Sequence, residues 1–219
     1  GGSWQGWQVP LITSSAHAAA RIEEIPTDNI LKKFGEGMKV AVIAGFQGIS
    51  REGRITTLGR GGSDTSAVAF AAAFDAVRCD IYTDVDGVYT TDPRITSKAR
   101  KLDRIAFEEM LELASLGAKV LQTRSVELAM RYNVKLRVLS SFEEMSDDAG
   151  TLVCAEEDIV ESNVVAGVAY SRDEAKMTLQ GVADRPGIAA AIFGPLAEAG
   201  VNVDMIVQNI SDGGTTDMT

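Results

Sequence analysis

The chain has 219 residues, of which 45% are hydrophobic and 24% charged, and its formal net charge is -10 at pH 7. This composition predicts one or two folded domains with a sizeable core and excludes a disordered chain. The acidic balance disfavours nucleic acid and anionic membranes as partners, and no apolar run approaches the roughly 20 residues of a membrane-spanning helix. We expect a cytoplasmic enzyme or binding protein.

Strand and helix signals alternate along the first part of the chain. Residues 39–45 form a short β-branched run closed by glycine, which predicts a buried strand. An alanine-rich segment at 63–77 starts at a good capping residue, Ser63, and predicts a buried helix. Residues 79–83 predict a second strand, which runs into a turn-rich stretch.

The same alternation continues to residue 139. Helical spacing at 107–114 and again at 120–132 predicts two further helices, with Gly117 breaking or capping the first. At 134–139, Val and Leu alternate with Lys and Arg, which predicts a half-exposed strand. Repeated strand–helix–strand units favour an α/β fold with a mostly parallel sheet sandwiched by helices.

An acidic, turn-like seam at 142–150 separates this part from a second pattern. The pattern restarts as a strand, a turn, a helix and a strand, at 176–182, 184–187, 188–199 and 201–207. Gly200 is a natural end for that helix. The βαβ order fits the first half of a small ferredoxin-like module. We place the two domains at residues 1–160 and 161–219.

Both ends of the chain have the character of interior sequence. The first six residues have neither the charged nor the apolar region of a signal peptide. Residues 213–219 predict a turn followed by the opening of a strand. We therefore expect an internal fragment of a longer protein.

The cysteines and the histidine argue against several chemistries. Cys79 and Cys154 lie far apart and form no CxxC pair, which disfavours a disulfide scaffold and a structural zinc site. His17 is the single histidine, so a multi-histidine metal site is excluded. A Ser-His-Asp triad would need His17, and no GxSxG motif is present. We interpret His17 as a plain polar residue.

The strongest local signal is the glycine-rich segment at 58–67. Its glycines allow close approach to a ligand, and the helix that starts after them offers free N–H groups and a positive dipole end. Arg60 adds a planar fork that can grip a carboxylate or phosphate. Asp64 could cap the helix, hold a lysine or orient a cation. The alternative is an ordinary glycine-rich turn with an Asp/Ser cap.

Two weaker signals follow. The loop at 82–94 leaves the carboxyl end of a strand, where open α/β sheets bind ligands, and offers hydroxyls, carboxylates and an arginine. It lacks the ligand spacing of an EF-hand, and a purely structural loop is an equal alternative. Lys119 lies beside a glycine break and is either a phosphate ligand or a solvated lysine.

Taken in order, these segments resemble the motif series of the aspartate kinases, within the amino-acid kinase family. The resemblance covers nearly the whole chain and is carried by residues 45–48, 56–64, 83–94 and 117–121. From about residue 165 the chain is similar to the ACT regulatory domain of that family, including residues 184–187 and 202–208.

The resemblance implies phosphoryl transfer from ATP, accompanied by Mg²⁺, to the side-chain carboxylate of L-aspartate. The product would be 4-phospho-L-aspartate, at the entry to lysine, methionine and threonine biosynthesis. Arg60 and Asp64 would be catalytic, Asp64 by organising the centre. The aspartate site would comprise Phe46, Arg60, Gly61, Gly62 and Ser63. The nucleotide would be bound by Thr83, Asp84, Tyr89, Thr90, Thr91, Asp92, Pro93, Arg94 and Lys119.

The same resemblance implies a homo-oligomer assembled through ACT domains, with lysine or threonine as feedback effector. A helix N-terminus and the strand after it would hold the carboxylate and amino group of the effector. The allosteric site would comprise Asp184, Pro186, Gly187, Ile188, Ala189, Asn202, Val203, Asp204 and Gln208.

The chain also departs from the family pattern. It has neither the opening Lys-Phe/Tyr-Gly-Gly turn with its phosphate-clamping lysine nor the Ser-Gly-Glu motif that helps to hold aspartate, and we do not equate residues 33–36 with the former. We therefore expect the chain alone to be inactive. Two other hypotheses stay open. One is a different amino-acid kinase of the same fold, acting on glutamate or acetylglutamate, and the other is a non-catalytic, amino-acid-sensing chain.

Overall fold

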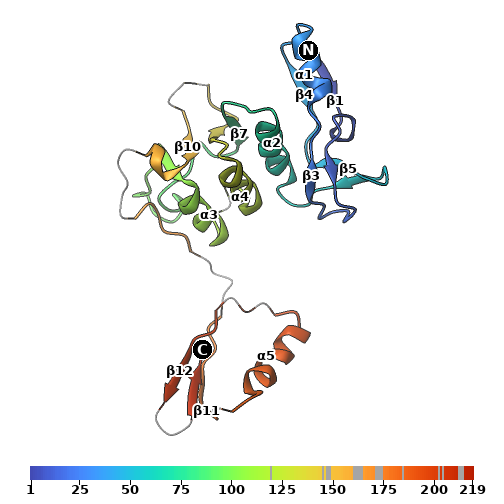
Figure 1. Ribbon diagram of the computed structural model, residues 1–219. Helices are drawn as coiled ribbons and strands as arrows, with labels where there is room; N and C mark the ends of the chain where they lie inside the picture. Colours follow the sequence, from blue (N-terminus) through green and yellow to red (C-terminus); the bar gives the residue numbers. More distant parts are fainter. Residues whose placement is uncertain are drawn as a thin grey trace. The chain divides into compact units, whose positions relative to one another are not determined.

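The computed structural model describes residues 1–118, 120–144, 146, 149–159, 165–170, 175–183, 185–201, 203, 205–211 and 215–219. The chain divides into two compact units, Gly1–Tyr170 and Ser171–Thr219 (Figure 1). The domain boundary that the sequence places at residue 160 stays a prediction, because residues 160–164 lie outside the described part of the chain.

The first unit is built around a four-stranded sheet with the order β7-β9-β10-β8. Its strands β7 and β9 are parallel, as are β8 and β10, whereas β9 and β10 are antiparallel. The strands are β7 (Cys79–Thr83), β8 (Arg104–Ala106), β9 (Leu136–Ser140) and β10 (Thr151–Cys154). The α/β class predicted from the sequence is confirmed, and the antiparallel pair makes this sheet mixed.

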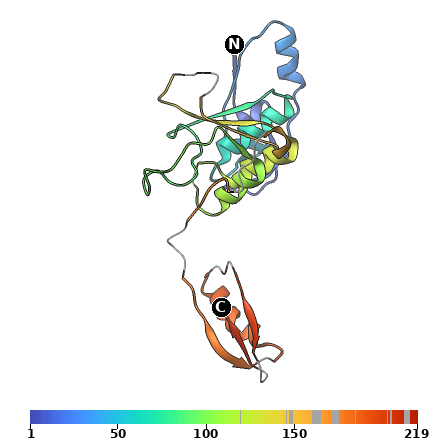
Figure 2. The same cartoon turned by 90° about the vertical axis from the view of Figure 1, so that its left-hand side faces the viewer.

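Three helices group together beside this sheet in both views (Figures 1 and 2). They are α2 (Gly62–Ala73), α3 (Phe107–Ser115) and α4 (Thr123–Tyr132). The predicted helices are confirmed, although α2 ends four residues before the predicted end and α4 begins three residues after the predicted start. One core cluster joins the helices to the sheet through buried side chains such as Val68, Met110, Val126, Ile81 and Val138.

Strand β9 corrects the prediction of a half-exposed strand. Its residues 136–139 are all buried, and even Arg137 is only 6% exposed. The reason is its place between β7 and β10, where the Arg137 guanidinium pairs with the Asp80 carboxylate of β7 at 2.8 Å. Arg137 therefore marks a buried guanidinium with an ion-pair partner and not a solvated side chain.

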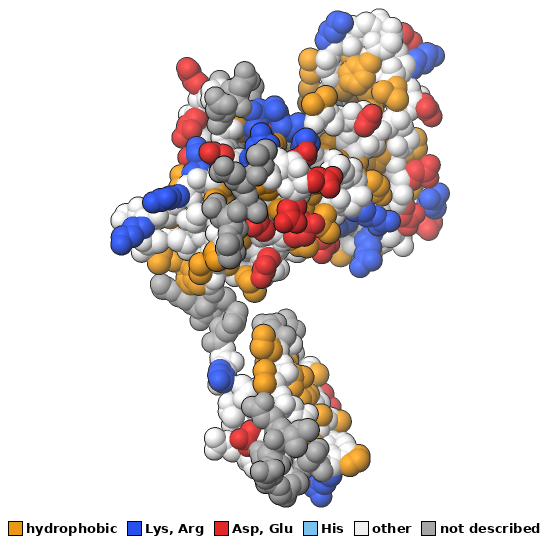
Figure 3. All heavy atoms as spheres, turned by 60° about the vertical axis from the view of Figure 1, so that its left-hand side comes forward, with side chains coloured by type: hydrophobic (Ala, Val, Ile, Leu, Met, Phe, Trp, Pro, Cys, Tyr) orange, Lys and Arg blue, Asp and Glu red, His pale blue; other side chains and the backbone are white. Residues whose placement is uncertain are grey.

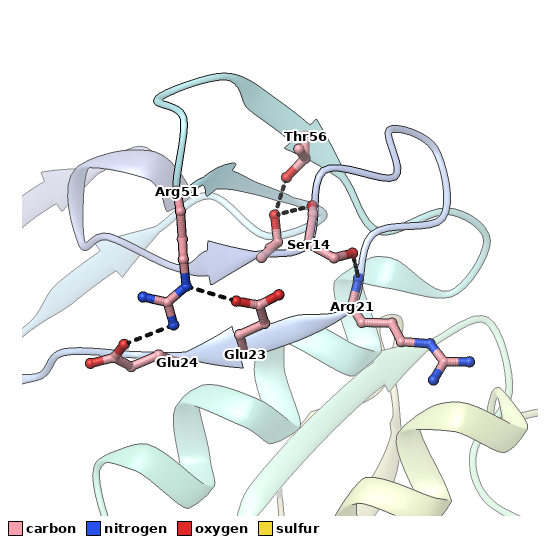
Figure 4. Close-up of polar contacts among 7 residues, drawn as sticks. Ser14, Arg21, Glu23, Glu24, Arg51 and Thr56 are labelled. Carbon is pink, nitrogen blue, oxygen red and sulfur yellow. Dashed lines mark hydrogen bonds and ion pairs between the residues drawn. The ribbon is translucent and has the colours of Figure 1, made fainter.

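A second four-stranded sheet of this unit has the order β3-β2-β5-β6. Its strands are β2 (Ile12–Thr13), β3 (Ile22–Glu24), β5 (Gln47–Ser50) and β6 (Ile55–Thr57). Polar side chains connect its strands (Figure 4): Thr13 and Thr56 share a buried hydroxyl hydrogen bond, and Arg51 pairs with Glu23 at 3.0 Å.

Strand β4 corrects a second prediction. The strand covers Ala41–Ile43 and pairs in parallel with β1 (Gly2–Trp4). It is not buried, since Val42 is 59% exposed. Helix α1 (Asp28–Gly35) precedes it. This helix contains Lys33, whose ammonium pairs with Glu36 at 2.8 Å, so residues 33–36 do not form a strand–turn clamp. Short 3-10 turns lie at Gly6–Gln8 and Glu156–Asp158.

The second unit contains three antiparallel strands in the order β11-β13-β12 and one helix. They are β11 (Leu179–Ala183), α5 (Ile188–Glu198), β12 (Gln208–Ser211) and β13 (Thr215–Met218). The predicted helix is confirmed: it ends at Glu198, and Gly200, whose φ is +71°, follows its C-cap Ala199. The strand predicted at 201–207 is wrong for its described residues, because pairing with β13 begins at Gln208.

The two units differ in how they cover apolar side chains. The first contains two clusters of buried hydrophobic side chains, and basic and acidic side chains are interspersed over the face seen in Figure 3. In the second, helix α5 has no buried residue, and large hydrophobic side chains such as Met177, Met205 and Ile206 are exposed. No helix in the part of the chain that the structure describes is long and apolar enough to cross a membrane.

Candidate active site

The glycine-rich loop between β6 and α2 is shaped by close packing. Gly59 has φ of +81°, and a Cβ there would overlap the carbonyl oxygen of Ala18. Gly61 has φ of +68° and forms the N-cap of α2, and a Cβ there would overlap the Gln122 side chain. The cap is therefore Gly61 and not Ser63 as predicted. Side chains larger than hydrogen have no room at either position.

Phe46 and Ser63 are brought together at the start of α2. The Phe46 backbone has φ of +69°, and its N–H donates to Ser66 Oγ at 3.2 Å. Ser66 Oγ in turn donates to the Ser63 carbonyl oxygen at 2.9 Å. Gly62 is buried against the Phe46 ring, with 2.8 Å between a hypothetical Cβ and the ring. Four of the five residues expected to bind aspartate, Phe46 and the segment 61–63, thus occupy one small region.

Arg60 and Asp64 are the charged residues of this region. Arg60 is exposed and, among the residues that the structure describes, has no hydrogen-bond or ion-pair partner. Asp64 lies in the first turn of α2 and does not cap the helix. Burial raises the pKa of the Asp64 carboxyl. A cation without a protein partner beside a helix N-terminus is an arrangement that suits an anionic ligand.

A second cluster lies where β7 ends. Thr83 closes the strand, and its hydroxyl donates to Asp84 Oδ1 at 3.1 Å. Asp86 accepts from the Tyr89 hydroxyl at 3.0 Å and pairs with Lys101 at 3.3 Å. Burial acts to raise the pKa of Asp86, but the hydrogen bonds from Tyr89 and Lys101 outweigh it and hold the pKa below its ordinary value. Tyr89 is thereby fixed beside the end of the strand.

The rest of this loop is held by local bonds. Thr90 exchanges hydrogen bonds with the Arg100 backbone, through its own N–H at 2.9 Å and its hydroxyl at 3.1 Å. Asp92 accepts from the Arg94 backbone at 2.8 Å and pairs with its guanidinium at 2.7 Å. Thr91 and Pro93 lie between these fixed points. The Arg94 guanidinium uses Nε and one Nη group for Asp92, so its other Nη group can still meet a ligand.

Thr151 anchors this loop and was missed by the sequence analysis. Its buried hydroxyl accepts from the Val88 N–H at 2.8 Å and donates to the Leu102 carbonyl oxygen at 2.6 Å. A Cβ on Gly87, which has φ of +155°, would come within 2.6 Å of that hydroxyl oxygen. No local pattern marks Thr151, because its partners lie about 50 to 60 residues earlier in the chain.

Several predicted residues lie outside the described residues: Lys119, Asp184, Asn202 and Asp204. Next to Lys119, Gly117 has φ of +112°, and the Ala118 N–H donates to the Leu113 carbonyl oxygen at 2.9 Å, which ends α3 as predicted. In the second unit, Gly187 is the N-cap of α5, so Pro186, Ile188 and Ala189 lie at the start of that helix. Gln208 opens β12, with Val203 in the segment before it.

The structure does not join the two clusters of the first unit by a hydrogen bond or ion pair among the described residues. Helix α2 connects them indirectly, since its Val68 shares a core cluster with Ile81 of β7. Within the described ranges, no three His, Cys, Asp or Glu side chains are grouped so that they could hold a metal ion.

Comparison with known proteins identifies the family. The model of the amino acid kinase family matches residues 5–140, and the model of the ACT domain matches residues 177–219. The chain belongs to the amino acid kinase family. The resemblance to aspartate kinases seen in the sequence is confirmed by the relatives and structures described next.

The aspartate kinase Ask_LysC of Stutzerimonas stutzeri is 56% identical over 218 residues, which are 99% of this chain and 52% of that protein. Aspartokinase III of E. coli in complex with lysine and aspartate is similar in structure, with a TM-score of 0.71 and 31% identity. The same enzyme in complex with aspartate and ADP gives a TM-score of 0.65. The similarity covers 99% of this chain and 48% of each of those chains. The chain thus spans about half the length of the proteins it matches.

Proposed function

We propose that the full-length protein carrying this chain is an aspartate kinase that transfers the γ-phosphoryl group of ATP to the side-chain carboxylate of L-aspartate. The product is 4-phospho-L-aspartate, the entry to lysine, methionine and threonine biosynthesis. The observation that carries the proposal is the start of α2, where Arg60 has no partner among the described residues and lies next to a glycine-capped helix N-terminus.

This region supplies the aspartate site. The Arg60 guanidinium grips a carboxylate with two parallel N–H groups, which a lysine cannot reproduce. Gly61 and Ser63 offer backbone N–H groups at the start of α2, whereas the Gly62 N–H donates to the Gly59 carbonyl oxygen at 3.0 Å. The chain at Phe46 is fixed against this turn by Ser66. The similar E. coli enzyme was solved in complex with aspartate, which supports aspartate as the ligand.

The loop after β7 supplies the nucleotide site. It lies at the carboxyl end of the parallel pair β7 and β9, where α/β sheets bind ligands. Thr83, Asp84 and the segment from Tyr89 to Arg94 line it, and Lys119 adds a charge for the phosphates. Mg²⁺ arrives with ATP, because this ion is held largely by substrate phosphates and one or two carboxylates, and it supplies neutralising charge there.

Phosphoryl transfer needs positioning and compensation of spread-out negative charge more than covalent help from the protein. Arg60 orients the acceptor carboxylate and offsets its charge. Asp64, whose pKa burial raises, organises the centre and holds its lysine in this proposal. The nucleotide loop keeps the phosphates in line with the acceptor.

The second unit supplies regulation. Its exposed hydrophobic side chains, Met205 and Ile206 among them, favour assembly through ACT domains into a homo-oligomer. Lysine or threonine binds near the start of α5 and β12, in line with the lysine present in the similar E. coli structure. The protein works in the cytoplasm.

The test is ADP release by the full-length protein, coupled to a detector and measured with aspartate, glutamate or acetylglutamate as the acceptor. Turnover that depends on aspartate supports the proposal. Turnover with glutamate or acetylglutamate instead assigns a different amino-acid kinase. Calorimetry with ATP, aspartate, lysine and threonine completes the test, because effector binding without substrate binding identifies a non-catalytic sensing chain.

A further inference from the structure

Arg124 lies near the start of α4 and contacts two loops that are distant in sequence. Its guanidinium donates to the Leu58 carbonyl oxygen at 3.0 Å and to the Ala20 carbonyl oxygen at 2.8 Å. Leu58 begins the glycine-rich loop that carries Arg60, and Ala20 is the penultimate residue of the loop at residues 14–21. Both Leu58 and Ala20 are buried in a small core cluster with Leu11.

The loop at 14–21 is itself a closed unit. Ser14 and Arg21 exchange hydrogen bonds, one through the Ser14 hydroxyl at 3.0 Å (Figure 4) and one through the Ser14 N–H at 2.9 Å. Within it, Ala18 has φ of +67°. A residue other than glycine keeps this conformation where the surrounding structure holds it.

The two loops are in direct contact. The Ala18 N–H donates to the Thr57 hydroxyl at 3.1 Å, and the Ala20 N–H donates to the Thr57 carbonyl oxygen at 3.1 Å. Gly59 packs so closely on the Ala18 carbonyl that it has no room for a Cβ. A change in the path of one loop therefore displaces the other, and Arg60 is the next residue after Gly59.

Arg124 does not act as part of an ion pair. Among the described residues no carboxylate pairs with it, and its side chain is partly buried. Burial and the charge of Arg21 both lower the pKa of its guanidinium. The two carbonyl oxygens that Arg124 binds stabilise its partly buried positive charge. Without Arg124, each of these oxygens would lose its hydrogen-bond donor.

We infer that Arg124 is a positioning residue for the aspartate site, because its guanidinium fastens the Leu58 and Ala20 carbonyls and thereby fixes the loop that presents Arg60. The inference rests on the proposed function. Arg124 itself touches no part of the nucleotide cluster among the described residues, so its effect falls on the acceptor and not on ATP.

The test compares Arg124→Met, Arg124→Lys and, as a matched control on the same helix, Arg131→Met. Arg131 is exposed, lies in the last turn of α4 and has its guanidinium carbon 5.6 Å from the centre of the Tyr132 ring. In the full-length protein, Arg124→Met is expected to lower kcat/KM for aspartate by roughly 10- to 100-fold while KM for ATP stays unchanged. Arg124→Lys, which can reach one carbonyl at a time, falls between this variant and the parent, and Arg131→Met matches the parent.

Amide hydrogen exchange separates this inference from the proposed function. Peptides covering residues 14–21 and 57–62 should exchange faster in both Arg124 variants and not in the control. Unchanged exchange, or equal losses for aspartate and ATP, overturns the positioning role. A parent without aspartate-dependent turnover overturns the proposed function, and the exchange result still decides whether Arg124 fixes the loops. If Arg124→Met does not fold, Arg124→Lys decides.

Discussion

At the scale of single residues, Arg60 and Asp64 carry charges that nothing in the described structure neutralises directly. Both lie within one turn of the start of α2, one exposed and one half-buried. Because their surroundings differ, different measurements test them. The role of Arg60 is tested by kinetics with aspartate, and that of Asp64 by the pH dependence of stability.

Arg60→Ala should cost roughly 2–5 kcal/mol of transition-state binding, because it leaves a substrate carboxylate without its paired donors. Steady-state kinetics of the full-length protein with aspartate measure this loss as a fall in kcat/KM. Arg54→Ala is the control, since Arg54 is also exposed but lies on the turn between β5 and β6. An unchanged kcat/KM in Arg60→Ala would remove Arg60 from the site.

Asp64→Asn should stabilise the fold at neutral pH but not in acid. Burial raises the folded-state pKa of this carboxyl above its ordinary value of 3.8, so the native state binds the proton more tightly than the unfolded chain does. Stability from this group is complete below the unfolded pKa and is lost as pH rises through the folded pKa. The difference in Tm between variant and parent is thus near zero below pH 3.8 and positive at neutral pH. A constant difference would contradict it.

At the scale of elements, the packing of the glycine-rich loop and the pairing of β7 with β9 are the features to test. Each combines a local conformation with a contact to a distant segment. A control variant that changes the same local feature but has no distant contact therefore separates the effect of the local conformation from that of the contact.

Gly59→Ala should destabilise the chain more than Gly53→Ala. Both glycines have positive φ, +81° and +78°, so each alanine pays a backbone strain of about 1–2 kcal/mol. A Cβ at Gly59 also collides with the Ala18 carbonyl, whereas nothing lies within 4 Å of a Cβ at Gly53. Urea unfolding of the two variants measures the difference. An equal loss of unfolding free energy in the two variants would show that the loop adjusts to the added Cβ without a measurable loss of stability.

Asp80→Asn should lower the free energy of unfolding by roughly 2–4 kcal/mol at neutral pH, because it leaves the buried Arg137 without its charge partner. Burial acts to raise the pKa of Asp80, but hydrogen bonds from Arg137 and Arg78 outweigh it and lower the pKa. The stability from this group is therefore present above the unfolded pKa and is lost as pH falls through the folded pKa.

Urea titrations at several pH values check the Asp80 prediction. The control is Glu36→Gln, which breaks the exposed Lys33–Glu36 pair. Exposed pairs contribute about 0–1 kcal/mol, so this control should stay near the parent. A loss in Asp80→Asn no larger than in the control would show that Arg137 is solvated or finds another partner.

At the scale of the whole molecule, the residues proposed for catalysis and those proposed for regulation belong to different compact units. The proposed aspartate and nucleotide residues that the structure describes lie within Gly1–Tyr170, and the proposed effector residues lie within Ser171–Thr219. Changes in the second unit should therefore alter inhibition while the catalytic constants without effector stay the same.

Gln208→Ala should weaken inhibition by lysine or threonine, because it removes an amide at the start of β12 that can bind the amino or carboxylate group of the effector. Inhibitor titrations of the full-length protein measure this effect, and Gln180→Ala on the exposed face of β11 is the matched control. Superimposable curves for Gln208→Ala and the parent would place the effector elsewhere.

The sequence by itself determined the features that depend on neighbours along the chain. Local spacing predicts the helices α2 and α5, the strand β7 and the order of the motifs. The glycines at 59 and 61 indicate a tightly turned loop. Residues within a few positions of one another create these signals, so no distant contact is needed to interpret them.

Only the tertiary structure decided which segments meet. It buried Arg137 between two strands, left Val42 exposed on a two-stranded sheet, and brought Thr151 to the loop after β7 and Arg124 to the glycine-rich loop. These outcomes depend on strand order and on hydrogen bonds between groups 50 or more residues apart. A side chain's environment is set by such partners, and one sequence carries no local mark of them.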